Sequence, residues 1–162
     1  INRNKDPIER KGLEYSISYK PNNRISTRFN YSLTDVTFDG GLNKGNYIPL
    51  VAKHTGSLTA YYNFFNDMSL SATWNYVGDK FFDNDQDNSF FAKIPSYSTV
   101  DMKVTYENDN FDIDFSMNNL LNKEYFETGT TNSLLFDAVH TRFNAQPMPE
   151  RNFLFTIRYK FD

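Results

Sequence analysis

The stretch NFLFTIRYKF, residues 152–161, alternates apolar and polar side chains almost without interruption. The apolar set is Phe153, Phe155, Ile157, Tyr159 and Phe161. The polar set is Asn152, Thr156, Arg158 and Lys160, and only Leu154 breaks the pattern. Because successive side chains of an extended chain point to opposite sides, this period of two predicts a β-strand with one apolar and one polar face.

The same alternation recurs in six earlier segments, and no segment shows the period of an amphipathic helix. These segments are residues 13–19, 25–33, 57–64, 68–76, 99–106 and 111–118. Short turns of residues that tolerate turn geometry join them at 21–23, 65–67 and 108–110, whereas the other connections are long, roughly 35–49, 79–95 and 122–150. The sequence therefore predicts an all-β fold, an antiparallel up-and-down meander of about seven strands with unlike ends.

Composition excludes several classes of protein. The 162 residues have a mean hydropathy of −0.64 although 17% of them are aromatic. No stretch reaches the roughly 18 consecutive apolar residues that a membrane-spanning helix needs. The net charge of −3 argues against nucleic acid as a partner. Cysteine is absent, which excludes disulfides, thiolate metal sites and thiol nucleophiles.

Two architectures fit such a meander. In a soluble β-sandwich the apolar faces pack against a second sheet, whereas in an outer-membrane barrel they contact lipid and the polar faces line the lumen. Runs of about 9–11 residues, long enough to cross a bilayer, favour the barrel. Aromatic residues near both strand ends also favour it, because such rings prefer the membrane interface. Tyr19, Tyr62, Phe64, Tyr106, Phe111, Tyr159 and Phe161 lie beside the short turns, and Tyr31, Tyr76 and Phe153 lie toward the long loops.

The polar rows carry charges of both signs in mid-strand, which a water-filled or plugged lumen tolerates. We predict that these charges face the lumen of a transmembrane β-barrel. They are Glu14, Arg28, Asp101, Lys103, Asp112, Asp114, Arg158 and Lys160. The alternative at this point is a soluble β-sandwich that binds a ligand such as carbohydrate on exposed aromatic rings.

Six short motifs, in order along nearly the whole chain, resemble the C-terminal barrel strands of TonB-dependent outer-membrane receptors. The motifs are KGLE at 11–14, IPLVAKHT at 48–55, YVGD at 76–79, IPSYSTVD at 94–101, NNLLNKEY at 118–125, and PERNF with YKF at 149–161. The most specific is NNLLNKEY, which is similar to the family's N-L-[FL]-[DN]-K-x-Y at the end of the penultimate strand. Each motif alone is short, and the resemblance rests on all six occurring in the same order as in the family.

The resemblance implies a barrel of about 22 strands in the outer membrane of a Gram-negative bacterium, with the lumen closed by an N-terminal plug domain. Residues 1–162 would be the C-terminal part of that barrel, and the plug and the earlier strands would be absent. The lumen charges would pair with each other and with the plug. The protein would be a transport receptor without catalysis or cofactor, driven by TonB acting on the plug. Its cargo is expected to be a ferric siderophore, with haem, cobalamin and oligosaccharide still open.

Cations and rings on the long loops are candidates to bind an anionic aromatic cargo, as the resemblance implies. They are Lys44, Tyr47, Phe90, Lys93, Arg142 and Phe143. Asp83, Asp85 and Asp87 alternate like the first half of a calcium loop, but Asn88 and Ile94 stand where that loop needs Gly and Glu, so a solvated loop is the favoured interpretation. No nucleophile and base cluster around His54 or His140, and neither receives a catalytic or metal role.

Overall fold

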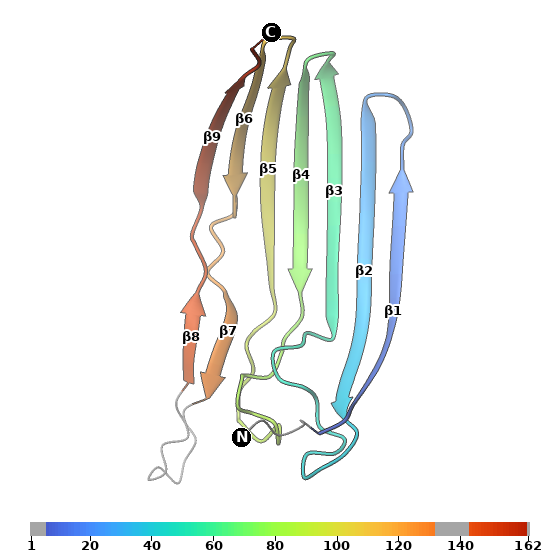
Figure 1. Ribbon diagram of the computed structural model, residues 1–162, viewed down its shortest axis with the longest axis vertical. Helices are drawn as coiled ribbons and strands as arrows, with labels where there is room; N and C mark the ends of the chain where they lie inside the picture. The colour runs from blue at the N-terminus through green and yellow to red at the C-terminus, as the bar shows by residue number, and fades with distance from the viewer. Residues whose placement is uncertain (1–5, 132–142, 162) are drawn as a thin grey trace.

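The computed structural model describes residues 6–131 and 143–161 as a chain of β-strands and loops (Figure 1). The strands are β1 (Ile8–Tyr19), β2 (Ile25–Phe38), β3 (His54–Phe65), β4 (Met68–Val77), β5 (Tyr97–Glu107), β6 (Phe111–Asn118), β7 (Phe126–Thr131), β8 (Phe143–Pro147) and β9 (Asn152–Tyr159). Seven of them form one sheet in the order β1-β2-β3-β4-β5-β6-β9, and all neighbours are antiparallel. The predicted all-β meander is confirmed.

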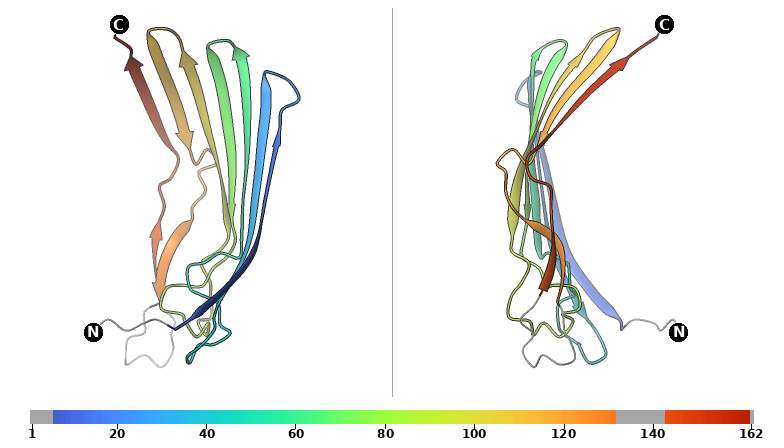
Figure 2. Two further views of the ribbon diagram at one scale, coloured as in Figure 1. Left: turned by 45° about the vertical axis from the view of Figure 1, so that its right-hand side comes forward. Right: turned by 90° about the vertical axis from the view of Figure 1, so that its left-hand side faces the viewer.

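The two ends of the sheet differ, as the connection lengths predicted. In Figure 1 the three short turns and the C-terminus lie at the top, and the long connections lie at the bottom. We call these the short-turn end and the loop end. The sheet is curved and its strands fan apart toward the short-turn end (Figure 2). No helix in residues 6–131 and 143–161 is long and apolar enough to cross a membrane.

The register places the apolar rows of all seven strands on one face. One row of cross-strand partners runs through Ile17, Phe29, Leu58, Trp74 and Val100. Another runs through Thr27, Ala60, Ala72, Met102, Met117 and Phe153. Directly opposed residues share a face, so the intervening polar rows form the other face. Leu154 lies on that polar face, opposite Ser116.

The apolar face is not covered by a second layer of the described chain. Leu13 is 61% exposed, Leu58 43% and Phe155 61%. In a β-sandwich these side chains would be buried between two sheets. The β-sandwich alternative is therefore wrong for this sheet, and a contiguous exposed apolar surface of this size marks a membrane or partner surface.

The most buried part of the described chain lies in the loops, not in the sheet. Phe82, Phe90 and Ile94, from the connection between β4 and β5, form a small core with exposed fractions of 2%, 9% and 0%. Leu50, Ala92, Phe126 and Ala145 pack against it. The loop end is therefore a packed unit built from three connections.

The last long connection, predicted over residues 122–150 as a loop without strands, contains two strands. Within it, β7 and β8 pair in a separate two-stranded sheet, with a register shift between Phe126 and Thr128. The sequence of β7, FETGTT, has no apolar alternation, so the period-two test does not detect it. Its stability comes from pairing with β8 and from the packing of Phe126 and Ala145 on the loop core.

We expect Gly129→Ala to destabilise this hairpin by about 1–3 kcal/mol, the usual cost of overpacking. A Cβ at this position would lie 2.7 Å from Phe82 Cε1 and 2.9 Å from Asn144 O. The measurement is amide hydrogen exchange at Asp83, whose N–H donates to Gly129 O, and exchange should become faster. Gly56→Ala is the control, because its Cβ would meet nothing closer than 3.5 Å. Equal exchange in both variants would contradict this packing.

Candidate functional site

A ladder of polar side chains crosses the polar face of the sheet. Ser16 Oγ donates to Asn30 Oδ1 at 2.8 Å, and Asn30 Nδ2 donates to Ser57 Oγ at 3.2 Å. Farther along, the Thr59 and Thr73 hydroxyls lie 3.1 Å apart, and Asn75 Nδ2 donates to Asp101 Oδ2 at 3.1 Å. These contacts connect β1 through β5, so this face is a continuous hydrogen-bonded surface.

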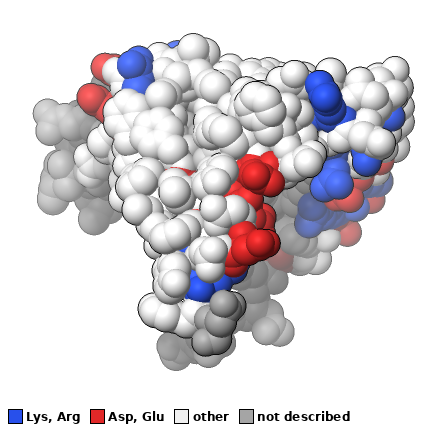
Figure 3. Space-filling view, turned by 90° about the horizontal axis from the view of Figure 1, so that it is seen from above, with Lys and Arg blue, Asp and Glu red and all other residues white. Residues whose placement is uncertain are grey.

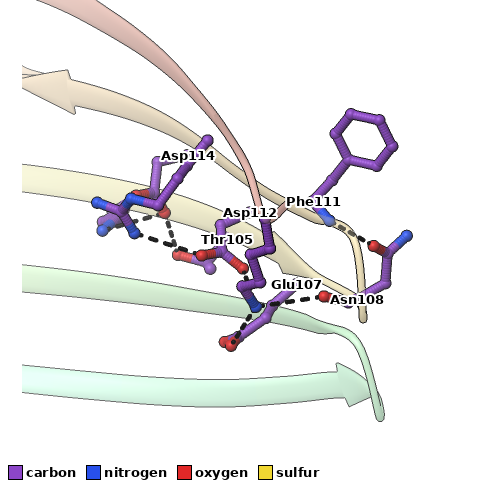
Figure 4. Close-up of polar contacts among 9 residues, drawn as sticks. Thr105, Glu107, Asn108, Phe111, Asp112 and Asp114 are labelled. Atoms are coloured by element: carbon purple, nitrogen blue, oxygen red, sulfur yellow. Dashed lines mark hydrogen bonds and ion pairs between the residues drawn. The ribbon is translucent and has the colours of Figure 1, made fainter. Parts of the chain in front are cut away.

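A cluster of charges lies on the polar face near the short-turn end (Figure 4). Asp112 contacts Lys160 Nζ at 2.8 Å and Arg158 Nη1 at 3.3 Å. Lys160 also contacts Glu107 at 3.4 Å. Asp114 accepts from Thr105 at 2.7 Å and pairs with Lys103 at 3.1 Å.

Most of the predicted lumen charges have partners within the described residues. Asp101, Lys103, Asp112, Asp114, Arg158 and Lys160 all contact neighbours on the sheet. Glu14 and Arg28 form no ion pair with any described residue. Viewed from the short-turn end, acidic and basic side chains gather in small groups on a largely uncharged surface (Figure 3). In these pairs the basic side chain is exposed and the aspartate is partly buried. Pairs that reach solvent contribute roughly 0–1 kcal/mol each to the free energy of folding, so their main effect is to neutralise charge on the polar face.

The most specific sequence motif has a structural role. Asn119, 4% exposed, follows β6 in the left-handed conformation, with φ of 51°. Its side chain donates to Lys123 O at 2.9 Å and Pro149 O at 3.2 Å, and accepts from Lys123 N at 2.8 Å. Its backbone N–H donates to Asp101 at 2.8 Å. One residue thus joins the end of β6 to the segments before β7 and β9.

At the loop end the structure brings two of the predicted ligand-binding residues together. The rings of Tyr47 and Phe81 stack with centroids 6.0 Å apart and planes at 13°. Lys93 Nζ lies 4.5 Å from the Phe81 centroid, and Lys53 Nζ lies 5.5 Å from the Tyr47 centroid. We call Tyr47, Phe81, Lys53 and Lys93 the aromatic–lysine cluster. Residue type and local sequence do not single out Phe81 and Lys53, because only the pairing of two distant loops places them beside Tyr47 and Lys93.

Acidic partners hold both lysines of the aromatic–lysine cluster. Lys93 pairs with Asp79 at 2.8 Å, and Lys53 pairs with Asp35 at 3.0 Å. The hydrogen bond to Asp35 raises the pKa of Lys53 above its usual value. Both lysine side chains are about half exposed, at 45% and 44%.

The other predicted loop residues lie elsewhere. Lys44 pairs with Asp39 at 3.7 Å on an exposed turn. Phe90 is buried in the loop core against Phe82, and Phe143 packs on Phe82 with centroids 5.0 Å apart. Arg142 and His140 lie outside the described residues. The Phe90 position makes it a core residue rather than an accessible contact for a ligand.

The three aspartates that alternate like the first half of a calcium loop, Asp83, Asp85 and Asp87, do not converge on one site. Asp83 Oδ1 accepts from Asn84 N at 3.0 Å, Asp85 Oδ1 from Phe90 N at 3.1 Å, and Asp87 Oδ1 from Ser89 N at 3.3 Å. Across residues 6–131 and 143–161, no group of three or more His, Cys, Asp and Glu side chains is placed to hold a metal ion. His54, which lies at the start of β3, contacts Tyr31, and its Nδ1 lies 2.8 Å from the Tyr31 hydroxyl oxygen.

Comparison with known proteins agrees with this geometry. Residues 1–120 match the family described as TonB dependent receptor-like, beta-barrel. The metal-pseudopaline receptor CntO of Pseudomonas aeruginosa is 30% identical over 125 residues, which is 74% of this chain and 17% of the receptor. The chain therefore spans about a sixth of the length of that relative.

Two solved receptors show the same fold. The ferric yersiniabactin uptake receptor FyuA of Yersinia pestis aligns with a TM-score of 0.77 and 20% identity, over 95% of this chain and 24% of FyuA. The siderophore receptor PiuA of Acinetobacter baumannii aligns with a TM-score of 0.75 and 19% identity, over 95% of this chain and 22% of PiuA. The exposed apolar face thus corresponds to the lipid-facing side of a barrel. The chain belongs to the TonB-dependent receptor β-barrel family, whose members are transporters rather than enzymes and lie in the outer membrane of Gram-negative bacteria.

Proposed function

We propose that this chain supplies the C-terminal strands of a longer receptor, in a barrel of about 22 strands closed by a plug domain. Two free sheet edges support this: among the described strands, β1 pairs only with β2 and β9 pairs only with β6. Unpaired backbone N–H and C=O groups cannot face lipid without a large cost, so further strands must cover both edges.

In this arrangement the loop end faces the extracellular medium and the short-turn end faces the periplasm, as in outer-membrane barrels generally. The polar ladder and the charge cluster at Asp112 then line the lumen beside the plug. TonB would act through the plug, which is not among the segments described for this chain.

We propose that the cargo is a ferric siderophore or a similar metal chelate. The observation that carries this is the relatives' own names, which are those of metal-pseudopaline, ferric yersiniabactin and siderophore receptors. Metal chelates of this class are often anionic and aromatic. The aromatic–lysine cluster offers two stacked rings and two half-exposed lysine side chains at the loop end, which suit such a ligand.

The experiment that tests the class of function is growth on limiting iron. A strain that carries the full-length receptor should grow with the cognate ferric siderophore, and deletion of either the receptor or TonB should abolish that growth. Growth that persists without TonB would contradict energised transport by this receptor.

The aromatic–lysine cluster gives a second prediction. We expect Lys53→Ala with Lys93→Ala to weaken cargo binding by the full-length receptor about fivefold to thirtyfold, since each cation near an aromatic ring of the cargo contributes roughly 0.5–1 kcal/mol. The measurement is the dissociation constant of the ferric siderophore from the purified receptor. Lys20→Ala at the short-turn end is the control and should leave that constant unchanged. An unchanged constant in the double variant would show that cargo binds elsewhere on the loops.

A further inference from the structure

The loop between β4 and β5 buries a carboxylate oxygen that has no partner. Asp85 is 2% exposed, and its Oδ1 accepts the Phe90 N–H at 3.1 Å. Its Oδ2 is fully buried, and no described residue donates a hydrogen bond to it. An ionised oxygen buried in this way costs several kcal/mol unless a positive charge or a donor compensates it.

Among the described residues, the pocket that Asp85 lines supplies further oxygens and no basic side chain. Asp85 lines a polar pocket of about 330 Å³, and the pocket's other lining residues are Asn43, Asn84, Gln86, Asp87, Ser89, Phe90 and Thr131. None of these is Lys or Arg. Asp87 lines the same pocket, so two carboxyl groups border it, and its described lining residues supply no counter-charge. The pocket has room for an ion with its remaining water ligands.

We propose that Asp85 and Asp87 bind one divalent cation of the calcium class. Ca²⁺ accepts six to eight oxygens in irregular geometry, including carbonyl, amide and water oxygens, so two carboxylates with such neighbours are sufficient. Mg²⁺ fits less well, because it demands near-octahedral geometry. Sequence analysis favoured a solvated loop here over a site formed by all three aspartates, and Asp83 is not part of this site, since its carboxylate accepts from Asn84 N and does not line the pocket.

The position of the site suggests what the cation does. Asn88, one residue beyond Asp87, accepts from Tyr47 N at 2.7 Å and donates to Tyr47 O at 3.0 Å. Asn46 Nδ2 donates to Gln86 O at 3.2 Å, and Thr131 N donates to Asp83 O at 3.1 Å. The aspartate loop therefore joins the connection that carries Tyr47 to β7. A bound cation would hold the aromatic–lysine cluster in place for cargo, and this last role rests on the proposed function.

The test is a titration of full-length receptor with Ca²⁺ alone, after removal of divalent ions with a chelator. We expect binding with a dissociation constant on the order of 10⁻⁴–10⁻³ M, as in extracellular calcium sites. Asp85→Asn and Asp87→Asn should each weaken the binding about tenfold or more. Asp83→Asn is the matched control in the same loop and should stay within about twofold of the natural receptor.

Hydrogen exchange gives a second readout, and its measurement on the natural receptor does not depend on the folding of a variant. Ca²⁺ should slow amide exchange across residues 82–90 in the natural receptor and in Asp83→Asn, and not in Asp85→Asn. Identical titrations of the natural receptor and Asp85→Asn, or exchange that Ca²⁺ does not change, would overturn the proposal and leave Asp85 neutralised by a proton. Because the probe is Ca²⁺ without cargo, this outcome is independent of whether the receptor transports a siderophore.

Discussion

Replacing Ala72 by arginine is expected to destabilise the receptor in a bilayer by roughly 2–4 kcal/mol, the cost of this side chain on the lipid face near the membrane centre. Ala72 lies in the middle of β4, the central strand of the seven-stranded sheet. It pairs with Ala60 and Met102 on the apolar face. The measurement is the free energy of unfolding of the full-length receptor, by denaturant titration in lipid bilayers.

Thr73→Arg is the matched control for this substitution. Thr73 is the next residue of the same strand but lies on the polar face, opposite Asp101, with which an arginine can pair. The variant loses the contact between the Thr59 and Thr73 hydroxyls, so we expect its free energy of unfolding to change by about 1 kcal/mol or less. Equal losses in the two variants would mean that the apolar face does not contact lipid.

The second large effect is expected at Asn119. Asn119→Ala should destabilise the full-length receptor by about 3–4 kcal/mol, because the side chain makes three hydrogen bonds in a buried position and alanine also resists the left-handed backbone. The loss leaves Lys123 N and Pro149 O without these partners. The measurement is again the free energy of unfolding, and residues 143–161 should show faster hydrogen exchange.

Two further variants separate these contributions. Asn119→Gly keeps the backbone free to adopt a positive φ, so it should cost about 1 kcal/mol less than Asn119→Ala. Asn118→Ala removes a single exposed contact, with Asn152 at 2.9 Å, and should cost less than about 1 kcal/mol. If Asn119→Ala is no worse than Asn118→Ala, the hydrogen bonds of Asn119 do not hold the end of β6 to the segments before β7 and β9 as the structure indicates.

The loop end was the least predictable part of the molecule. Residue type alone points to the ligand candidates, and the structure places Tyr47 and Lys93 in the aromatic–lysine cluster, Phe90 in the loop core and Lys44 on an exposed turn. Whether a candidate residue is accessible or buried depends on contacts between residues far apart in the chain, such as Tyr47 with Asn88 and Thr131 with Asp83. The local sequence around each residue contains no signal for those contacts. The β7–β8 hairpin, for example, lacks the apolar alternation that would mark its first strand.

The sequence by itself determined the strands of the sheet, the face on which each side chain lies, and the unlike ends. These follow from local geometry, because a period of two assigns each residue to a face wherever the chain is extended. The tertiary structure alone decided how the long connections pack, that NNLLNKEY serves as a structural junction, and that Asp85 buries an oxygen without a partner. Such features depend on side chains that meet only after the strands have paired, and pairing across tens of residues leaves no periodic trace in the sequence.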